Sequence, residues 1–135
     1  MESERFKLDV VTLKRTVFAG EIESVMAPGT AGYFGILRNH TPFVSSLQVG
    51  ITTITKPDGG KLRLATTGGF LMTDGKKVIL LADAAEFPQE IDAARARAAK
   101  ERAEKRLAER SPGTDIDRAR AALLRALTRL KAAGT

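Results

Sequence analysis

The sequence Gly69-Phe70-Leu71-Met72-Thr73-Asp74-Gly75-Lys76-Lys77-Val78-Ile79-Leu80-Leu81 decides how the first part of the chain folds. Two apolar runs flank Asp74-Gly75, a pair of residues typical of a tight β-hairpin turn. The second run, residues 78–81, is apolar at every position. It is therefore expected to form a strand that is buried on both faces and paired with the run before it.

The same kind of pattern extends towards the N-terminus. Residues 49–55 and 62–65 flank the turn sequence of residues 57–60, which predicts another hairpin. Residues 6–11 alternate in polarity, as in a strand with one buried face. Strands that recur about every 8 to 12 residues, without a helix-length segment between them, favour a β-sandwich or small barrel over an α/β fold. We predict an antiparallel β-sandwich over residues 1–84.

The composition changes at Ala85, after which Ala, Arg, Glu, Lys and Leu dominate, as in long helices. Pro88 fits the boundary of a first helix from Glu90 to Glu109, because proline is tolerated in the first turn or before it. A second helix is expected from Asp115 to Ala132. The chain is thus predicted to be α+β, with a helical hairpin domain over residues 85–135.

The hairpin has recognisable ends and an apolar seam. Ser111-Pro112-Gly113 ends the first helix, and Thr114 with Asp117 resembles a capping box that opens the second. So short a connection implies antiparallel helices. The expected apolar positions of the second helix are Ile116, Ala119, Leu123, Leu127 and Leu130, and those of the first are Ile91, Ala94, Ala98, Ala103 and Leu107. So thin a seam is compatible with a hairpin that opens and equally with a stable alanine-rich hairpin.

The chain is basic. Its 22 Lys and Arg against 16 Asp and Glu give a net charge of +6, and residues 85–135 hold 12 basic and 8 acidic side chains. This excess favours acidic partners, among them nucleic acid. A nucleic-acid platform usually interleaves aromatic and basic residues, whereas aromatic residues are only 5% of this chain. A basic β domain with a helical tail that binds nucleic acid or another polyanion is the alternative interpretation.

The residues for common catalytic sites are missing. Cysteine is absent and His40 is the single histidine, which excludes a thiol nucleophile, a Cys-based metal site and a two-His zinc site. The phosphate-binding pattern Gly-x-x-x-x-Gly-Lys-Ser/Thr is also absent. A hydrolase using His40, or acid–base chemistry by Asp83 and Glu86, is a weaker interpretation, because neither comes with a defined constellation. We therefore expect no catalytic residues.

Several strings in the sequence resemble the epsilon subunit of the F-type ATP synthase. They are Gly20-Glu21-Ile22-Glu23-Ser24-Val25-Met26-Ala27-Pro28-Gly29, Gly32-Tyr33-Phe34-Gly35-Ile36-Leu37-Arg38-Asn39-His40-Thr41-Pro42-Phe43, Gly68-Gly69-Phe70-Leu71 and Val78-Ile79-Leu80-Leu81-Ala82-Asp83-Ala84-Ala85-Glu86. Ile91-Asp92-Ala93-Ala94-Arg95-Ala96 is similar to that family's nucleotide-binding motif. The resemblance covers nearly the whole chain and its motifs occur in the family's order.

The resemblance implies a non-catalytic rotor subunit. Its sandwich would dock on the gamma subunit and the membrane rotor ring, with Tyr33, Phe34 and His40 at the docking surface. Its hairpin would lie folded or extend along the central shaft, and the extended form would inhibit ATP hydrolysis. The start of the chain shows neither a signal peptide nor a transit peptide, which fits a bacterial protein in a complex on the cytoplasmic face of the plasma membrane.

ATP is the regulatory ligand that the resemblance implies, with or without magnesium, and no prosthetic group is expected. The matching positions are Glu86, Ile91, Asp92, Arg95, Ala96, Arg102, Arg125 and Arg129. Helical spacing agrees, because Asp92, Arg95 and Arg102 recur along one side of the first helix. Ordinary ion pairs, such as Asp92 with Arg95, are the competing interpretation of these charges.

The beta subunit is the partner implied for the extended hairpin. Arg118, Arg125 and Arg129 are expected to lie together, roughly opposite the apolar stripe of their helix, where they could meet an acidic segment of that subunit.

Overall fold

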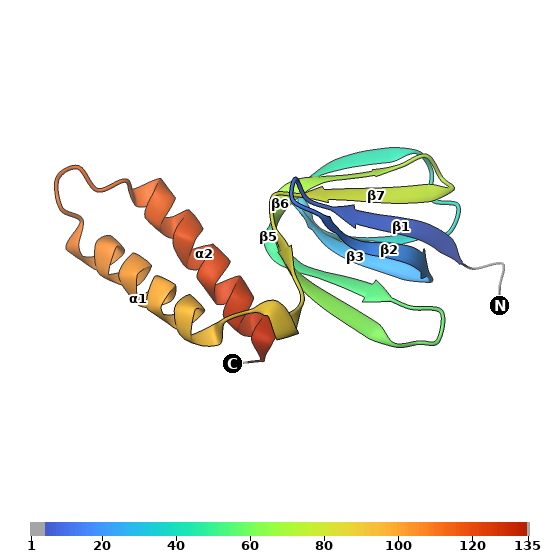
Figure 1. The fold of residues 1–135 in the computed structure, drawn as a ribbon. Helices are drawn as coiled ribbons and strands as arrows, with labels where there is room; N and C mark the ends of the chain where they lie inside the picture. The colour runs from blue at the N-terminus through green and yellow to red at the C-terminus, as the bar shows by residue number, and fades with distance from the viewer. Residues whose placement is uncertain (1–4, 135) are drawn as a thin grey trace. The chain divides into compact units, whose positions relative to one another are not determined.

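The computed structural model describes residues 5–134 and divides the chain into two compact units at Phe87 and Pro88 (Figure 1). The first unit contains the strands and the second contains the helices. The strands are β1 (Phe6–Val11), β2 (Thr16–Ile22), β3 (Ser24–Gly29), β4 (Gly32–Leu37), β5 (Phe43–Thr55), β6 (Lys61–Thr73), β7 (Lys77–Ala82) and β8 (Ala85–Glu86).

The strands form the predicted sandwich around two long central strands. Their order is β2-β1-β7-β6-β5-β3-β4, with β8 on β6. The long antiparallel pair β5–β6 belongs to both layers: the Phe43 end lies in the layer with β7, and the Thr55 end lies in the layer with β3. The expected hairpin turns at residues 57–60 and at Asp74-Gly75 are confirmed, the second within a connection of residues 74–76. One pairing differs from the antiparallel prediction, because β1 and β7 are parallel.

The core lies between the two layers. Alternate side chains of the strands are fully buried in it, among them Leu8, Val10, Ile22, Val25, Ile36, Ile54, Leu64, Leu71, Val78 and Leu80. The prediction that residues 78–81 are buried on both faces is wrong. Val78 and Leu80 point into the core, whereas Leu81 is 41% exposed, because it lies on the outer face of its layer.

The boundary between the two parts lies after the predicted one. Ala85 and Glu86 form β8 and pair with Thr66 and Ala65 of β6, so they belong to the sheet unit rather than to the hairpin. Composition alone put them with the helices, because alanine and glutamate are good helix formers.

The helical unit contains a 3-10 turn η2 (Pro88–Glu90) and the helices α1 (Ala93–Glu109) and α2 (Ile116–Ala133). The first helix does not begin at Glu90 as predicted. Asp92 is its N-cap, and its carboxylate accepts the backbone N–H of Arg95 at 3.0 Å. The second helix is also capped by an aspartate, Asp115, and not by Thr114. A side-chain oxygen at either position can cap a helix, so sequence alone leaves the cap uncertain by one residue.

The seam between α1 and α2 is made largely of alanine. The buried apolar positions are Ala96 and Ala103 on α1 and Ala119, Ala126 and Leu130 on α2, and Thr128 of α2 is buried as well. Two expected seam residues lie outside it: Ala94 is exposed and Leu127 is 42% exposed. Both Leu127 and Ala126 keep a spacing of three or four residues from Leu123 and Leu130. Ala126 occupies the seam because it lies seven residues, almost two full turns, after the buried Ala119 and therefore points in nearly the same direction.

Candidate functional site

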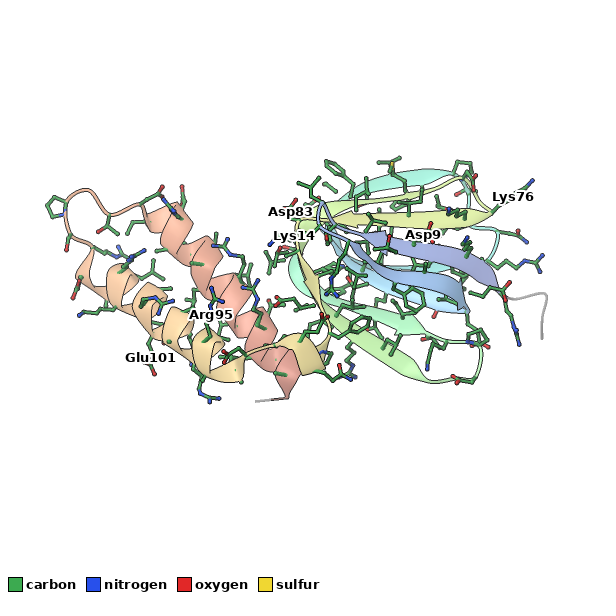
Figure 2. All side chains as sticks on the ribbon, in the orientation of Figure 1. Asp9, Lys14, Lys76, Asp83, Arg95 and Glu101 are labelled. Atoms are coloured by element: carbon green, nitrogen blue, oxygen red, sulfur yellow. The ribbon has the colours of Figure 1, made fainter. Side chains whose placement is uncertain are left out.

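The arginines of α1 form a row along one side of the helix. Arg95, Arg102 and Arg106 are all exposed, and each directly precedes a buried or half-buried seam residue. Because successive residues are about 100° apart on a helix, this row flanks the seam. Figure 2 shows Arg95 and Glu101 projecting from different sides of α1. The three arginines therefore lie on one side of α1, next to the seam.

The arginines of α2 repeat the same arrangement. Arg118, Arg125 and Arg129 each precede a buried residue, namely Ala119, Ala126 and Leu130. The three arginines lie together as predicted. They are not opposite the seam, because a residue next to a seam position lies only about 100° away from it. They therefore flank the seam, as the α1 row does.

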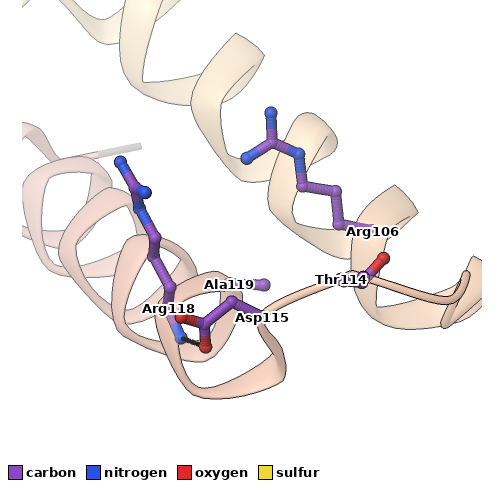
Figure 3. A pocket seen from close by; sticks show the side chains of 6 residues that line it. Arg106, Thr114, Asp115, Arg118 and Ala119 are labelled. Atoms are coloured by element: carbon purple, nitrogen blue, oxygen red, sulfur yellow. Dashed lines mark hydrogen bonds between the residues drawn. The ribbon is translucent and has the colours of Figure 1, made fainter.

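The two rows lie on the same face of the hairpin. In two antiparallel helices, the residues that come directly before a seam residue in the sequence point to the same side of the pair on both helices. An open pocket of about 420 Å³ supports this, since Arg106 and Arg118 both line it (Figure 3). We call this set of arginines the basic face: Arg95, Arg102, Arg106, Arg118, Arg125 and Arg129.

The motif residues at the start of α1 have structural roles of their own. Asp92 is exposed and caps the helix. Ile91 is half-buried, and its N–H bonds the carbonyl of Pro88 at 3.2 Å. Ala96 is only 4% exposed, and its burial in the helical unit gives a reason for a small residue that is independent of any ligand. Glu86 lies on β8 in the other unit.

The basic face was only partly predicted. The structure brings Arg95, Arg102, Arg125 and Arg129 to one face, as expected of a site for several phosphates. Arg106 was missed, although it follows Arg102 by four residues, as Arg129 follows Arg125. That spacing was the signal available in the sequence. Glu86 is not part of this set, because it lies on β8 in the sheet unit.

The three expected docking residues lie on and after β4. Tyr33 is 56% exposed, and its hydroxyl accepts the backbone N–H of Ile51 at 3.1 Å. Phe34 is half-buried, and its ring packs edge-on against Phe43, with centroids 5.3 Å apart. His40 makes the same type of contact with Phe43, and its Nδ1 lies 2.7 Å from the carbonyl oxygen of Thr41.

The acidic residues and the histidine considered above lie in ordinary structural surroundings. Residues 5–134 contain no group of three His, Asp or Glu side chains that could hold a metal ion. Asp83, considered above for acid–base chemistry, is exposed at the bend after β7, where its Oδ2 lies close to Gly68. His40 is held by its neighbours in a turn-rich loop.

Neither helix among residues 5–134 has the length and apolar character needed to span a membrane.

Comparisons with known proteins agree with this architecture. The family model of the ATP synthase delta/epsilon chain β-sandwich domain matches residues 5–88, and that of the delta/epsilon chain long α-helix domain matches residues 89–134. The chain therefore belongs to the ATP synthase delta/epsilon chain family. As a member, it is a non-catalytic, structural and regulatory subunit of the F-type ATP synthase, in the central stalk of this membrane-associated complex.

Relatives match over nearly their whole length. The ATP synthase epsilon chain of Moorella thermoacetica is 50% identical over 127 residues, covering 94% of this chain and 95% of the relative. That of Pelotomaculum thermopropionicum is 48% identical over 134 residues, covering 99% of each chain. That of Desulforamulus reducens is 44% identical over 128 residues, covering 94% of this chain and 96% of the relative.

The fold is shared with distant proteins. A chain in the cryo-EM structure of the Euglena gracilis mitochondrial ATP synthase, OSCP/F1/c-ring, superposes with a TM-score of 0.82 at 21% identity, covering 96% of this chain and 81% of that one. A chain of the Tetrahymena thermophila central stalk and c-ring gives 0.59 at 12% identity, covering 95% of this chain and 96% of that one. These likenesses support the order of sandwich and helices.

Proposed function

We propose that the sandwich docks on the gamma subunit and the membrane rotor ring of the synthase, while the hairpin senses ATP and inhibits ATP hydrolysis when it extends. The observation that carries this proposal is the basic face, which gathers arginines from two helices that meet along an alanine seam. The complex would lie on the cytoplasmic face of the bacterial plasma membrane, where rotation of the ring is coupled to catalysis.

Two apolar patches on the outside of the sandwich support docking. On β3 and β4, Met26, Tyr33 and Leu37 share one outer face, because Met26 pairs with Gly35 between the other two. We call this the β4 patch. On the other layer, Phe70 pairs with Leu81, and both are exposed. Exposed apolar patches on a soluble domain are typical of protein interfaces.

The positions of Tyr33, Phe34 and His40 support their proposed docking role. Tyr33 presents its ring within the β4 patch. Phe34 and His40 support the neighbouring surface, because both rings pack against Phe43. The gamma subunit and the rotor ring are the proposed partners of this surface.

The basic face supports ATP binding by the folded hairpin. Arginine keeps its charge at all working pH values, and its planar guanidinium can donate two hydrogen bonds to a phosphate. Arg95, Arg102, Arg125 and Arg129 would hold the triphosphate. Asp92 would orient the base or ribose, or bind a magnesium ion that accompanies the nucleotide.

The alanine seam supports opening of the hairpin. Small buried side chains contribute little burial free energy to the contact between α1 and α2, because each buried CH₂ or CH₃ group contributes only about 0.8 kcal/mol. In the extended form, Arg118, Arg125 and Arg129 would meet an acidic segment of the beta subunit. Since Arg125 and Arg129 serve both contacts, ATP would favour the folded form and also occupy two of the inhibitory arginines.

Reconstitution with the gamma and catalytic subunits tests the proposal. The full chain is expected to copurify with the gamma subunit and to slow ATP hydrolysis, more at low ATP than at high ATP. A chain that ends at Phe87 should copurify without inhibiting. Leu37→Asp should weaken copurification, whereas Lys61→Asp, an exposed position outside both patches, should not. Failure of the full chain both to copurify and to change the hydrolysis rate would contradict the proposal.

A further inference from the structure

The two helices are copies of one sequence pattern. Asp92-x-x-Arg95-Ala96-Arg97-Ala98-Ala99 in the first is matched at a constant offset by Asp115-x-x-Arg118-Ala119-Arg120-Ala121-Ala122 in the second. The match continues, since Arg102-Ala103 corresponds to Arg125-Ala126, and Arg106-Leu107 corresponds to Arg129-Leu130. The hairpin is therefore an internal repeat of two helices.

The structure repeats as well as the sequence. Asp92 and Asp115 are both N-caps with nearly the same backbone angles, φ −82° and ψ 98° against φ −82° and ψ 99°. Each accepts the N–H three residues on at 3.0 Å. Ala96 and its counterpart Ala119 are both buried. Two like helices packed antiparallel are related by a local twofold axis. It exchanges Arg95 with Arg118 and Arg106 with Arg129.

This symmetry places the same residue types at the loop end of the hairpin and at its other end. The pocket described above lies at the loop end, and we call it the loop pocket. It is lined by Arg106, Gly113, Thr114, Asp115, Arg118 and Ala119 (Figure 3). The twofold axis relates Arg106, Asp115, Arg118 and Ala119 to Arg129, Asp92, Arg95 and Ala96. The same set of side-chain types thus occurs at both ends.

The charges of the loop pocket are not balanced within it. Both guanidiniums are exposed, and neither makes an ion pair with a carboxylate within residues 5–134. The Asp115 carboxylate also lines the pocket and keeps its negative charge while its Oδ1 accepts the backbone N–H of Arg118, so the two arginines still leave the lining with a net positive charge. Two like charges beside one cavity repel each other, and a bound anion that bridges them would relieve that repulsion.

We propose that the loop pocket binds a phosphate group, as a second anion site separate from the proposed ATP site. Arg106 and Arg118 donate hydrogen bonds to the phosphate oxygens from opposite sides, and Thr114 adds a hydroxyl donor. By bridging α1 and α2 at the loop, the phosphate holds the hairpin closed at the end where α2 begins. Inorganic phosphate, pyrophosphate and the phosphates of a nucleotide share the required chemistry, so the test compares all three.

The test is an NMR titration of the full chain with sodium phosphate, pyrophosphate and ATP, at constant ionic strength. Amide signals of residues 113–119 report on the loop pocket, and those of residues 92–96 report on the proposed ATP site. Arg106→Ala and Arg118→Ala should each weaken phosphate or pyrophosphate binding at the loop about tenfold, the effect of losing one charge-assisted contact. Arg120→Ala is the matched control, since it removes an arginine of the same helix from outside the basic face.

The two proposals give separable results. The proposal is supported if phosphate or pyrophosphate causes saturable shifts at residues 113–119 that are lost in the Arg106 and Arg118 variants and kept in the control. This result supports the loop pocket whether or not ATP shifts residues 92–96. Saturable shifts at residues 113–119 with ATP alone, with the same pattern of losses, assign the loop pocket to nucleotide phosphates and also support it. Absence of saturable shifts at the loop with all three ligands, or equal shifts in all variants, would overturn it.

Discussion

The hydroxyl of Tyr33 accepts the backbone N–H of Ile51 at 3.1 Å and lies close to the backbone of Gly50, which has no side chain to block it. The ladder between β3 and β5 is interrupted between Met26 and Gly29, and the Tyr33 side chain supplies an acceptor in this region. A Cβ at Gly50 would lie 2.7 Å from the Tyr33 hydroxyl. Tyr33, expected from the sequence as a docking residue, therefore also helps to hold β4 on the sandwich, because its side chain is hydrogen-bonded to β5.

Tyr33→Phe tests this structural role without removing the ring from the β4 patch. The change leaves the N–H of Ile51 without its acceptor. The free energy of unfolding should fall by about 1 kcal/mol, the usual net contribution of one such hydrogen bond. Urea unfolding of the full chain measures it. An unchanged free energy of unfolding would mean that water replaces the hydroxyl at no cost.

Gly50→Ala should destabilise the sandwich more strongly. Its Cβ would approach the Tyr33 hydroxyl and the Pro28 ring more closely than side chains allow. Overpacking of this kind costs about 1 to 3 kcal/mol. Gly35→Ala is the matched control, because the nearest atom to a Cβ there is 4.0 Å away. Thermal unfolding of both variants measures the difference, and Gly50→Ala should melt at the lower temperature. Equal melting temperatures would contradict the close packing at Gly50.

The sequence predicted the sandwich well because its signals are local. Turn residues and the alternation of side chains mark each strand, and burial in the core follows that alternation. The parallel pairing of β1 with β7 could not be predicted in the same way, because it joins segments far apart in the chain. Leu81 was misjudged because an apolar run does not reveal that the outer face of its layer is uncovered.

The candidate site was predicted less completely than the fold. A motif and helical spacing predict Arg95, Arg102, Arg125 and Arg129. The side of the hairpin on which they lie depends on which residues form the seam, and the predicted seam was wrong at Leu127. Ala126 occupies it instead, which moves the arginines from opposite the seam to its flank. The internal repeat is visible in the sequence, and comparing the two helices residue by residue would also have found Arg106.

Arg110→Gly should stabilise the hairpin. Arg110 is the C-cap of α1 and has a left-handed backbone, with φ 44° and ψ 43°, which favours glycine. Relief of this strain is expected to raise the free energy of unfolding by about 1 kcal/mol, even though the bond from Nε to the carbonyl of Leu107 is lost. Urea unfolding followed by helical circular dichroism measures it, and destabilisation would show that the side-chain bond matters more than the strain.

Asp74 should titrate at unusually low pH. The backbone N–H groups of Lys77 and Lys76 donate to its carboxylate and lower the pKa of Asp74 below its ordinary value. Because the folded-state pKa is the lower one, its contribution to stability is present above the unfolded-state pKa and is lost as pH falls through the folded-state pKa. Asp74→Asn should therefore weaken the acid dependence of stability. An NMR titration midpoint at the value of an unperturbed aspartate would contradict this account.

Calorimetric titration of the full chain with ATP tests the proposed nucleotide-sensing hairpin most directly. The account predicts saturable binding that is weaker for ADP and GTP. In the double variant Arg95→Ala, Arg125→Ala, binding should fall at least about tenfold, because two phosphate contacts are removed. The matched control, Arg97→Ala with Arg120→Ala, removes two arginines from outside the basic face and should bind normally. No binding up to millimolar ATP, or equal losses in both double variants, would contradict a nucleotide-sensing hairpin.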